Sequence, residues 1–293
     1  MGVMRCSARR YSVVVALALV VMAGLARAAE PQAPQPLRVA VYGSSYGLDN
    51  VHRALVGHMV KFRPDLVLHT GELVANGRRT QSWTVFDQAV KPLEAICRFH
   101  VSPGPKDGAR YIHGRFPPPE GASGVPAHYS FDHKGAHFVI LSPPKGRVTR
   151  SDPVTQWLDA DLAAAQGKPI FVLYHHPFHS VVGKGRAGMV GFYWTPLFAK
   201  HKVHIVFGGA HHLYVRTCQD GVTYIVSGGG GARLDRIQSR RNILPNDVVA
   251  ATHHYIEITI VVGDIRGRVV GPKGKTRDEF IIPIALKPAS AKP

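Results

Sequence analysis

The chain has 293 residues, a hydrophobic content of 45% and a formal net charge of +17 at pH 7. This length and apolar fraction are enough for one large domain, or two small ones, with a buried core. The positive charge is spread along the chain without a dense block or a nucleic-acid recognition motif, so we expect no nucleic-acid partner. It indicates a solvated cationic surface, or attraction to anionic ligands, lipid head groups or cell-wall polymers.

The first 28 residues have the pattern of a bacterial Sec-type signal peptide. Basic residues come first, then an apolar run over residues 13–25, then Ala26-Arg27-Ala28, which has the small-x-small form of a cleavage site. We expect cleavage near Ala28, export to the periplasm or the extracellular space, and no transmembrane anchor afterwards. A retained N-terminal anchor and a twin-arginine signal are the alternatives. Cleavage removes four arginines and no acidic residue, so the net charge falls from +17 to +13.

A Pro-rich linker over residues 29–36 precedes alternating strand and helix patterns. The predicted elements of this half are a strand over 37–42, a helix over about 49–62, and strands over 66–69 and 97–102. This order is an α/β pattern. Residues 108–126 are rich in Gly and Pro and predict a surface loop.

The second half continues the alternation and then becomes rich in strands. Asp152 is the expected N-cap of a helix, and a second helix is expected over about 192–200. The predicted strands cover residues 129–132, 137–141, 170–174, 204–207, 222–226, 255–262, 268–271 and 280–284. Without a repeat or an internal linker, residues 37–285 form one domain and 286–293 a C-terminal tail.

Two cysteines, Cys97 and Cys218, remain once Cys6 has left with the signal peptide. In an oxidising compartment they would be able to pair, and a loop of this length would contribute roughly 4–5 kcal/mol. Two free thiols are the alternative, because the sequence gives no distance between them.

Polar residues with metal-ligating side chains follow four of the predicted strands. They are Glu72, Asp107, the pair His175/His176 and the pair His211/His212. In open α/β sheets, sites form at the carboxyl ends of the strands, so we expect these turns to converge.

In this order, the turns and their strands resemble the calcineurin-like metallophosphoesterases, especially the exported bacterial branch akin to purple acid phosphatases. The resemblance covers about residues 37–285. It implies an α/β fold of four α/β/β/α layers, with two mixed β-sheets packed together and helices outside. It also implies a two-metal phosphoesterase site at the turns. The motifs that carry it are VAVYGSSYG, PDLVLHTGELVANG, YSFDHKGAHFVILS, TQWLDADLAAA, YHHP, VFGGAHHLYVR and VTYIVSGGGGA.

Several ligand positions of that family carry other residues here. The first turn, Gly-Asp-x-His in the family, has Ser44 and Tyr46. The third turn, Gly-Asn-His-Asp or Glu, has Pro105 and, in place of the histidine that protonates the leaving group, Lys106. The fifth, Gly-His-x-His, has Ala210 in place of its first histidine.

The retained positions are Glu72, His175 and His212, with His211 as a further candidate. Losing three ligands, at about 10–100-fold each, would weaken a binuclear centre by about 10³–10⁶-fold. The resemblance therefore implies an impaired phosphatase without an intact binuclear centre, and we expect it to bind an anionic, phosphate-type small molecule or phosphoester.

Two alternatives remain. One is a hydrolase that uses a single Mn, Fe or Zn ion held by Glu72, His175 and His212. The other is an envelope scaffold that keeps only the fold. The sequence identifies no protein partner.

Overall fold

The computed structural model describes residues 35–284, except 126, 145–147, 183–187 and 238–242. The chain divides into a unit of residues 1–35 and a unit of residues 36–293, and the description below concerns the second. The predicted signal peptide, nearly all of the linker, and the C-terminal tail lie outside the described residues. Within the described ranges, no helix is long and apolar enough to cross a bilayer.

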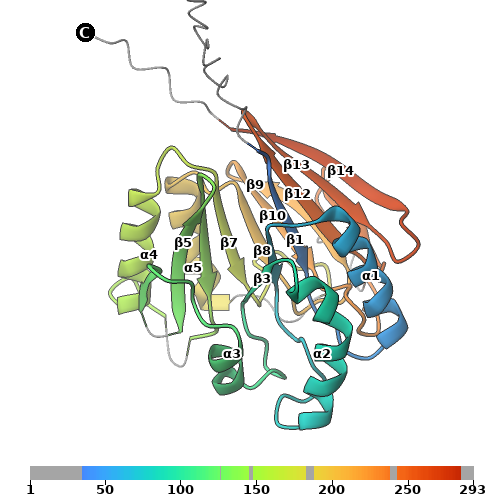
Figure 1. Cartoon of the computed structure of the whole chain (residues 1–293). Coiled ribbons are helices and arrows are strands. Elements are labelled where there is room, and N and C mark those ends of the chain that lie inside the picture. Colours follow the sequence, from blue (N-terminus) through green and yellow to red (C-terminus); the bar gives the residue numbers. More distant parts are fainter. Residues whose placement is uncertain (1–34, 126, 145–147, 183–187, 238–242, 285–293) are drawn as a thin grey trace, which may run out of the picture. The chain divides into compact units, whose positions relative to one another are not determined.

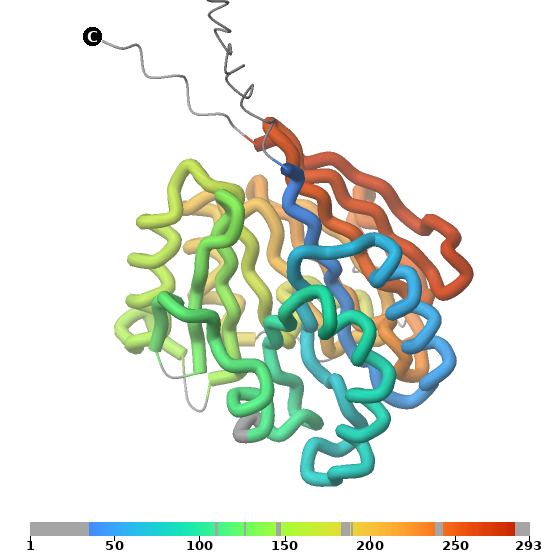
Figure 2. The backbone as a smooth tube through the Cα atoms, in the orientation of Figure 1, coloured from blue at the N-terminus to red at the C-terminus, as the bar shows by residue number. Residues whose placement is uncertain are grey.

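Two mixed β-sheets form the centre of the second unit. The six-stranded sheet has the order β14-β13-β12-β1-β2-β3, and the eight-stranded sheet has the order β11-β9-β10-β8-β7-β6-β5-β4. Figure 2 shows the first strand of the chain lying beside the strands of its last third, where β1 pairs antiparallel with β12. The strands of the first sheet are β1 (Leu37–Tyr42), β2 (Leu66–His69), β3 (Arg98–Val101), β12 (Tyr255–Val261), β13 (Asp264–Val270) and β14 (Thr276–Pro283).

Parallel pairing occupies one end of the six-stranded sheet and the middle of the eight-stranded sheet. Strands β1, β2 and β3 run parallel in the first sheet, and β6, β7, β8 and β10 run parallel in the second. Their apolar, β-branched sequences suit strands buried on both faces. The strands of the second sheet are β4 (Ser123–Val125), β5 (His128–His133), β6 (Ala136–Leu141), β7 (Ile170–Tyr174), β8 (Ile205–Gly208), β9 (Tyr214–Gln219), β10 (Val222–Ser227) and β11 (Val248–Ala250).

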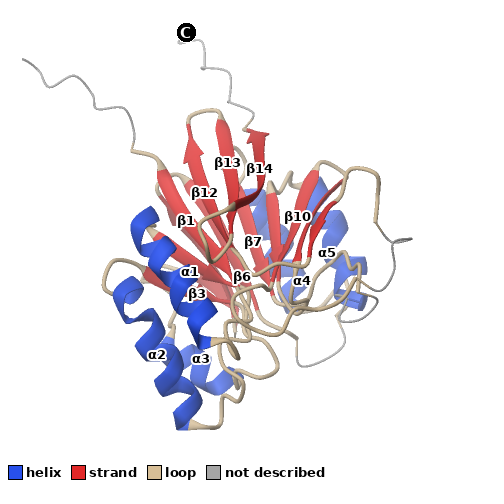
Figure 3. Ribbon diagram, turned by 90° about the vertical axis from the view of Figure 1, so that its right-hand side faces the viewer, coloured by secondary structure: helices blue, strands red, loops and turns tan. Residues whose placement is uncertain are grey.

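Helices cover the outer face of each sheet, as Figures 1 and 3 show. Helices α1 (Asp49–Phe62), α2 (Thr80–Glu94) and α3 (Ala109–Arg115) pack on the first sheet, and α4 (Pro153–Ala164) and α5 (Gly188–Lys200) pack on the second. A third apolar cluster lies between the sheets and draws residues from both. The expected four-layer α/β/β/α sandwich is therefore confirmed.

The observed elements differ from the predicted ones in several places. The segment 108–126 is not all loop, because α3 fits between Gly108 and Pro117 and buries Ile112 in the core under the first sheet. Helix α2 was not predicted, although Phe86, Val90 and Leu93 follow helical spacing and are buried. Strand β9 was not predicted either.

Proline within α2 is tolerated because its lost hydrogen bond is replaced. Pro92 has no N–H to donate to the Gln88 carbonyl one turn earlier. The Arg53 guanidinium of the neighbouring helix α1 donates to that carbonyl at 3.4 Å instead.

The N-terminal cap of α4 is the residue that the sequence predicts. The Asp152 carboxylate accepts hydrogen bonds from the backbone N–H groups of Val154 and Thr155, so the predicted N-cap is confirmed.

Cys97 is half-buried, Cys218 is exposed, and both are free thiols. Of the two alternatives that the sequence left open, a disulfide or two free thiols, the structure has the two free thiols.

Candidate functional site

The five turns meet at the carboxyl ends of the parallel strands of both sheets. Backbone hydrogen bonds join them directly: the Ser44 N–H donates to the Gly71 carbonyl at 2.9 Å, and the Gly209 N–H donates to the His175 carbonyl at 2.8 Å. Thr70 spans the two sheets, since its hydroxyl donates to the Ser227 carbonyl at 2.8 Å. Gly43 permits this approach, because a Cβ there would lie 1.8 Å from the Thr70 hydroxyl oxygen.

Three of these turns hold a non-glycine residue in the left-handed region. The φ angles are 51° at Ser44, 57° at Glu72 and 61° at Ala210. This conformation costs an L-residue about 1–2 kcal/mol, so the surrounding structure imposes it. The turns keep a strained backbone even where Ser44 and Ala210 offer no strong metal ligand.

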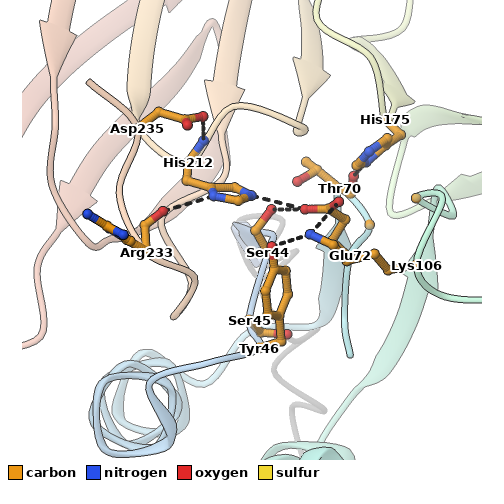
Figure 4. Close-up of polar contacts among 12 residues, drawn as sticks. Ser44, Ser45, Tyr46, Thr70, Glu72, Lys106, His175, His212, Arg233 and Asp235 are labelled. Atoms are coloured by element: carbon orange, nitrogen blue, oxygen red, sulfur yellow. Dashed lines mark hydrogen bonds and ion pairs between the residues drawn. The ribbon is translucent and has the colours of Figure 1, made fainter. Parts of the chain in front are cut away.

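The Glu72 carboxylate is the centre of the site (Figure 4). Its Oε1 lies 3.2 Å from the Lys106 Nζ, and its Oε2 lies 3.0 Å from the His212 Nε2. The Ser44 hydroxyl donates to the same Oε2 at 3.3 Å. Glu72 and Ser44 are buried, whereas the Lys106 side chain is 37% exposed. The Lys106 ammonium thus forms an ion pair with the buried Glu72 carboxylate.

Both ring nitrogens of His212 face hydrogen-bond acceptors. Nδ1 lies 2.9 Å from the Arg233 carbonyl oxygen, and Nε2 faces the Glu72 carboxylate. Neither acceptor has a proton to offer when Glu72 is ionised, so whichever ring nitrogen carries a proton donates to the acceptor that it faces. Asp235 fixes the backbone of this turn by accepting the His212 N–H at 3.0 Å.

The ionised state of Glu72 follows from its neighbours. Burial raises the pKa of Glu72, but the hydrogen bond from His212 and the charges around the carboxylate outweigh it and lower the pKa to about 2. Burial also lowers the pKa of Lys106, and contacts with Tyr46 and Glu72 outweigh that effect and raise it. Both partners are charged at neutral pH, so Glu72 and Lys106 form an ion pair.

Tyr46 forms one wall of the cluster. Its hydroxyl oxygen accepts a hydrogen bond from Lys106, whose Nζ lies 4.1 Å from the centre of the Tyr46 ring. Burial raises the pKa of Tyr46, so the phenol keeps its proton at neutral pH. This proton and the third N–H of the Lys106 ammonium are two donors without an acceptor among the described residues, and both are able to bind a ligand.

The remaining candidate residues lie in different environments. His175 is buried, and its Nδ1 donates to the Thr70 carbonyl at 2.7 Å, while burial lowers the pKa of His175 to about 4 and keeps it neutral. His211 is buried, and its Nε2 lies 3.4 Å from the Ser180 hydroxyl, away from Glu72. Pro105 is exposed and has no side-chain donor or acceptor.

Asp107 has a structural role that the sequence did not indicate. Its buried carboxylate accepts backbone N–H groups from Glu72 at 2.7 Å, Leu73 at 2.7 Å and Gly104 at 2.8 Å. The third turn is thereby joined to the second, and Asp107 holds Glu72 in position instead of facing a ligand.

Comparison with known proteins agrees with this architecture. No family model matches the chain, and no curated protein matches it. Among solved structures, a purple acid phosphatase from yellow lupin seeds (Lupinus luteus) is similar, with a TM-score of 0.73 and 17% identity over 85% of this chain and 54% of that one. A dimetal phosphatase from Danio rerio has a TM-score of 0.63 and 14% identity over 85% of this chain and 99% of that one. The fold is that of the calcineurin-like metallophosphoesterases.

A third solved structure with this fold is GAP50, the anchor in the inner membrane complex of Plasmodium. Its TM-score is 0.63, with 15% identity over 86% of this chain and 90% of that one. This chain spans about half the length of the lupin enzyme and most of the length of the other two.

The residues present do not fit the binuclear centre of the calcineurin-like enzymes. Ser44 offers a neutral hydroxyl that is bonded to Glu72, Pro105 and Ala210 offer no ligand atom, and the Lys106 ammonium lies against the carboxylate that would bridge two metals. Nowhere in the described part of the chain are three or more His, Cys, Asp or Glu side chains grouped to hold a metal ion. Glu72, His175 and His212 are therefore near one another without forming such a group.

Proposed function

We propose that this protein is an exported calcineurin-like phosphoesterase homologue that has lost two-metal catalysis and binds an anionic, phosphate-type ligand. The observation that carries the proposal is the position of Glu72 between Lys106 and His212. A bridging carboxylate that faces two metal ions in an active enzyme would here face the Lys106 ammonium and the His212 ring. The pattern of residues 1–28 supports export.

The charge and hydrogen bonding of the cluster favour an anion. The positively charged Lys106 ammonium keeps one N–H that contacts neither Glu72 nor Tyr46. A phosphate oxygen at Lys106 would accept hydrogen bonds from the remaining ammonium N–H and from the Tyr46 hydroxyl. Both bonds would be charge-assisted, because the phosphate is an anion. The Lys106 side chain is exposed enough to meet such a ligand from solvent.

A non-catalytic role is also consistent with GAP50, which is described as an anchor. The two-metal reaction needs a metal-bound water and a clamp on the phosphoryl oxygens. With Ser44, Pro105 and Ala210 at three ligand positions, we expect neither of the two metal ions to be held, and we therefore propose no hydrolytic step.

The first measurement is metal content. Mature protein is incubated with manganese, iron or zinc, desalted and subjected to elemental analysis, and turnover of a generic phosphoester is measured beside it. We expect metal at background and no turnover. Near-stoichiometric retention of one metal, lost in His212→Ala, would instead establish the single-metal hydrolase.

The second measurement is stabilisation by inorganic phosphate at constant ionic strength. A ligand present at a hundred times its Kd stabilises the folded state by about 2.7 kcal/mol. We expect this gain in the wild type, and we expect Lys106→Met to lose it. Lys200→Met is the matched control, because Lys200 is an exposed lysine in a surface ion pair with Asp159. No stabilisation in the wild type, together with no metal, would leave only the scaffold.

A further inference from the structure

An apolar pocket lies beside the ion cluster and shares Tyr46 with it. It has a volume of about 210 Å³ and lies between the turn after β1, the turn after β2 and helix α2. A cavity of about 150 Å³ is enough to admit benzene. The apolar side chains that line it are Leu73, Val74, Val85 and Phe86.

The lining combines this apolar surface with a few polar groups. Val85 is 39% exposed, and the polar side chains of Asp49, Gln81 and Ser82 also line the pocket. Large hydrophobic side chains at a concave site lose contact with water when a ligand covers them, which favours an apolar ligand group.

His52 adds one hydrogen-bond donor to the apolar lining. It is 2% exposed, lines the pocket, and its Nε2 lies 3.3 Å from the hydroxyl of the fully buried Tyr42. If Nε2 donated, the Tyr42 proton would have no acceptor, so Tyr42 donates and Nδ1 carries the His52 proton. Among the described residues Nδ1 has no hydrogen-bond partner. Burial lowers the pKa of His52 to about 4, which keeps the ring neutral.

We propose that the pocket binds the aromatic ring of an aryl phosphate whose phosphate is held at Lys106 and Tyr46. This inference rests on the proposed anion-binding function and specifies its ligand class. Tyr46 is the connection, since its ring lines the pocket and its hydroxyl contacts the Lys106 ammonium.

The test is calorimetric titration of the mature protein with inorganic phosphate, phenol and phenyl phosphate at one ionic strength. Phosphate provides the charge alone, phenol the ring alone, and phenyl phosphate both. We expect phenyl phosphate to bind at least about ten-fold more tightly than phosphate, because the ring leaves water. Equal affinities for these two would overturn the inference and leave the proposed function standing. If none of the three probes binds, the proposed function fails, and the inference fails with it.

A pocket-filling variant locates the effect. Val85→Trp would occupy the entrance, and we expect it to remove the advantage of phenyl phosphate while the phosphate affinity stays unchanged. Val262→Trp is the matched control, since Val262 is 72% exposed at the turn between β12 and β13 and outside the pocket. An advantage of phenyl phosphate that survives Val85→Trp in a folded variant would place the ring elsewhere and overturn the inference.

Discussion

Replacing Glu72 by glutamine tests whether the ion cluster stabilises the folded chain. The difference between the ordinary glutamate pKa of 4.5 and a pKa of about 2 in the folded state corresponds to about 3 kcal/mol of stability. Because folding lowers this pKa, the stabilisation is complete above pH 4.5 and is lost as the pH falls toward 2. Glutamine cannot ionise, and it leaves Lys106 and His212 without their shared counter-ion.

The assay is urea unfolding of both proteins between pH 7 and pH 2. We expect Glu72→Gln to lower the free energy of unfolding by about 3 kcal/mol at pH 7, and the two curves to approach each other below pH 4.5. Asp49→Asn is the control, since the pair of Asp49 with Arg53 is exposed and should contribute no more than about 0.5 kcal/mol. A Glu72→Gln variant as stable as the wild type at pH 7, or more stable, would refute the reasoning. That result is expected of a buried carboxylate whose charge is not stabilised by its protein neighbours and needs a metal ion.

Three further predictions concern other parts of the chain. Asp107→Asn should lower the free energy of unfolding by about 2–4 kcal/mol in chemical denaturation, because an amide NH₂ group would face backbone N–H donors in the buried turn. Cys218 should react with a thiol reagent much faster than Cys97, whose pKa burial raises to about 12, and similar rates in the folded protein would contradict this. Restoring the family's side chains should raise bound metal from background toward a binuclear centre, as checked by elemental analysis, and a variant that folds without metal would show that further residues are missing. The four restoring substitutions are S44D, P105N, K106H and A210H.

The sequence was sufficient to predict the strands and turns that build the site. Apolar runs ending at Gly43, Thr70 and His175 predict strands followed by turns, and the parallel order brings those turns to one edge. Helix α2 was missed because polar residues and Pro92 obscure its helical spacing. The compensation for Pro92 comes from Arg53, a residue of another helix, and no local pattern encodes such a contact.

The sequence alone did not predict the contacts between side chains within the site. The sequence indicates that Lys106 and Glu72 end neighbouring turns, but not that the ammonium lies 3.2 Å from the carboxylate. The contact of the His212 ring with the Arg233 carbonyl joins two positions that are 21 residues apart in the sequence. The pocket combines residues of α1, α2 and two turns, and a sequence pattern gives no volume.

The ion pair of Glu72 and His212 joins the two sheets, since Glu72 follows β2 and His212 follows β8. Under the proposed function, an anion that draws Lys106 or His212 away from Glu72 would weaken a contact between the sheets. By reciprocity, anything that strengthens the packing of one sheet on the other would then change the affinity for the anion.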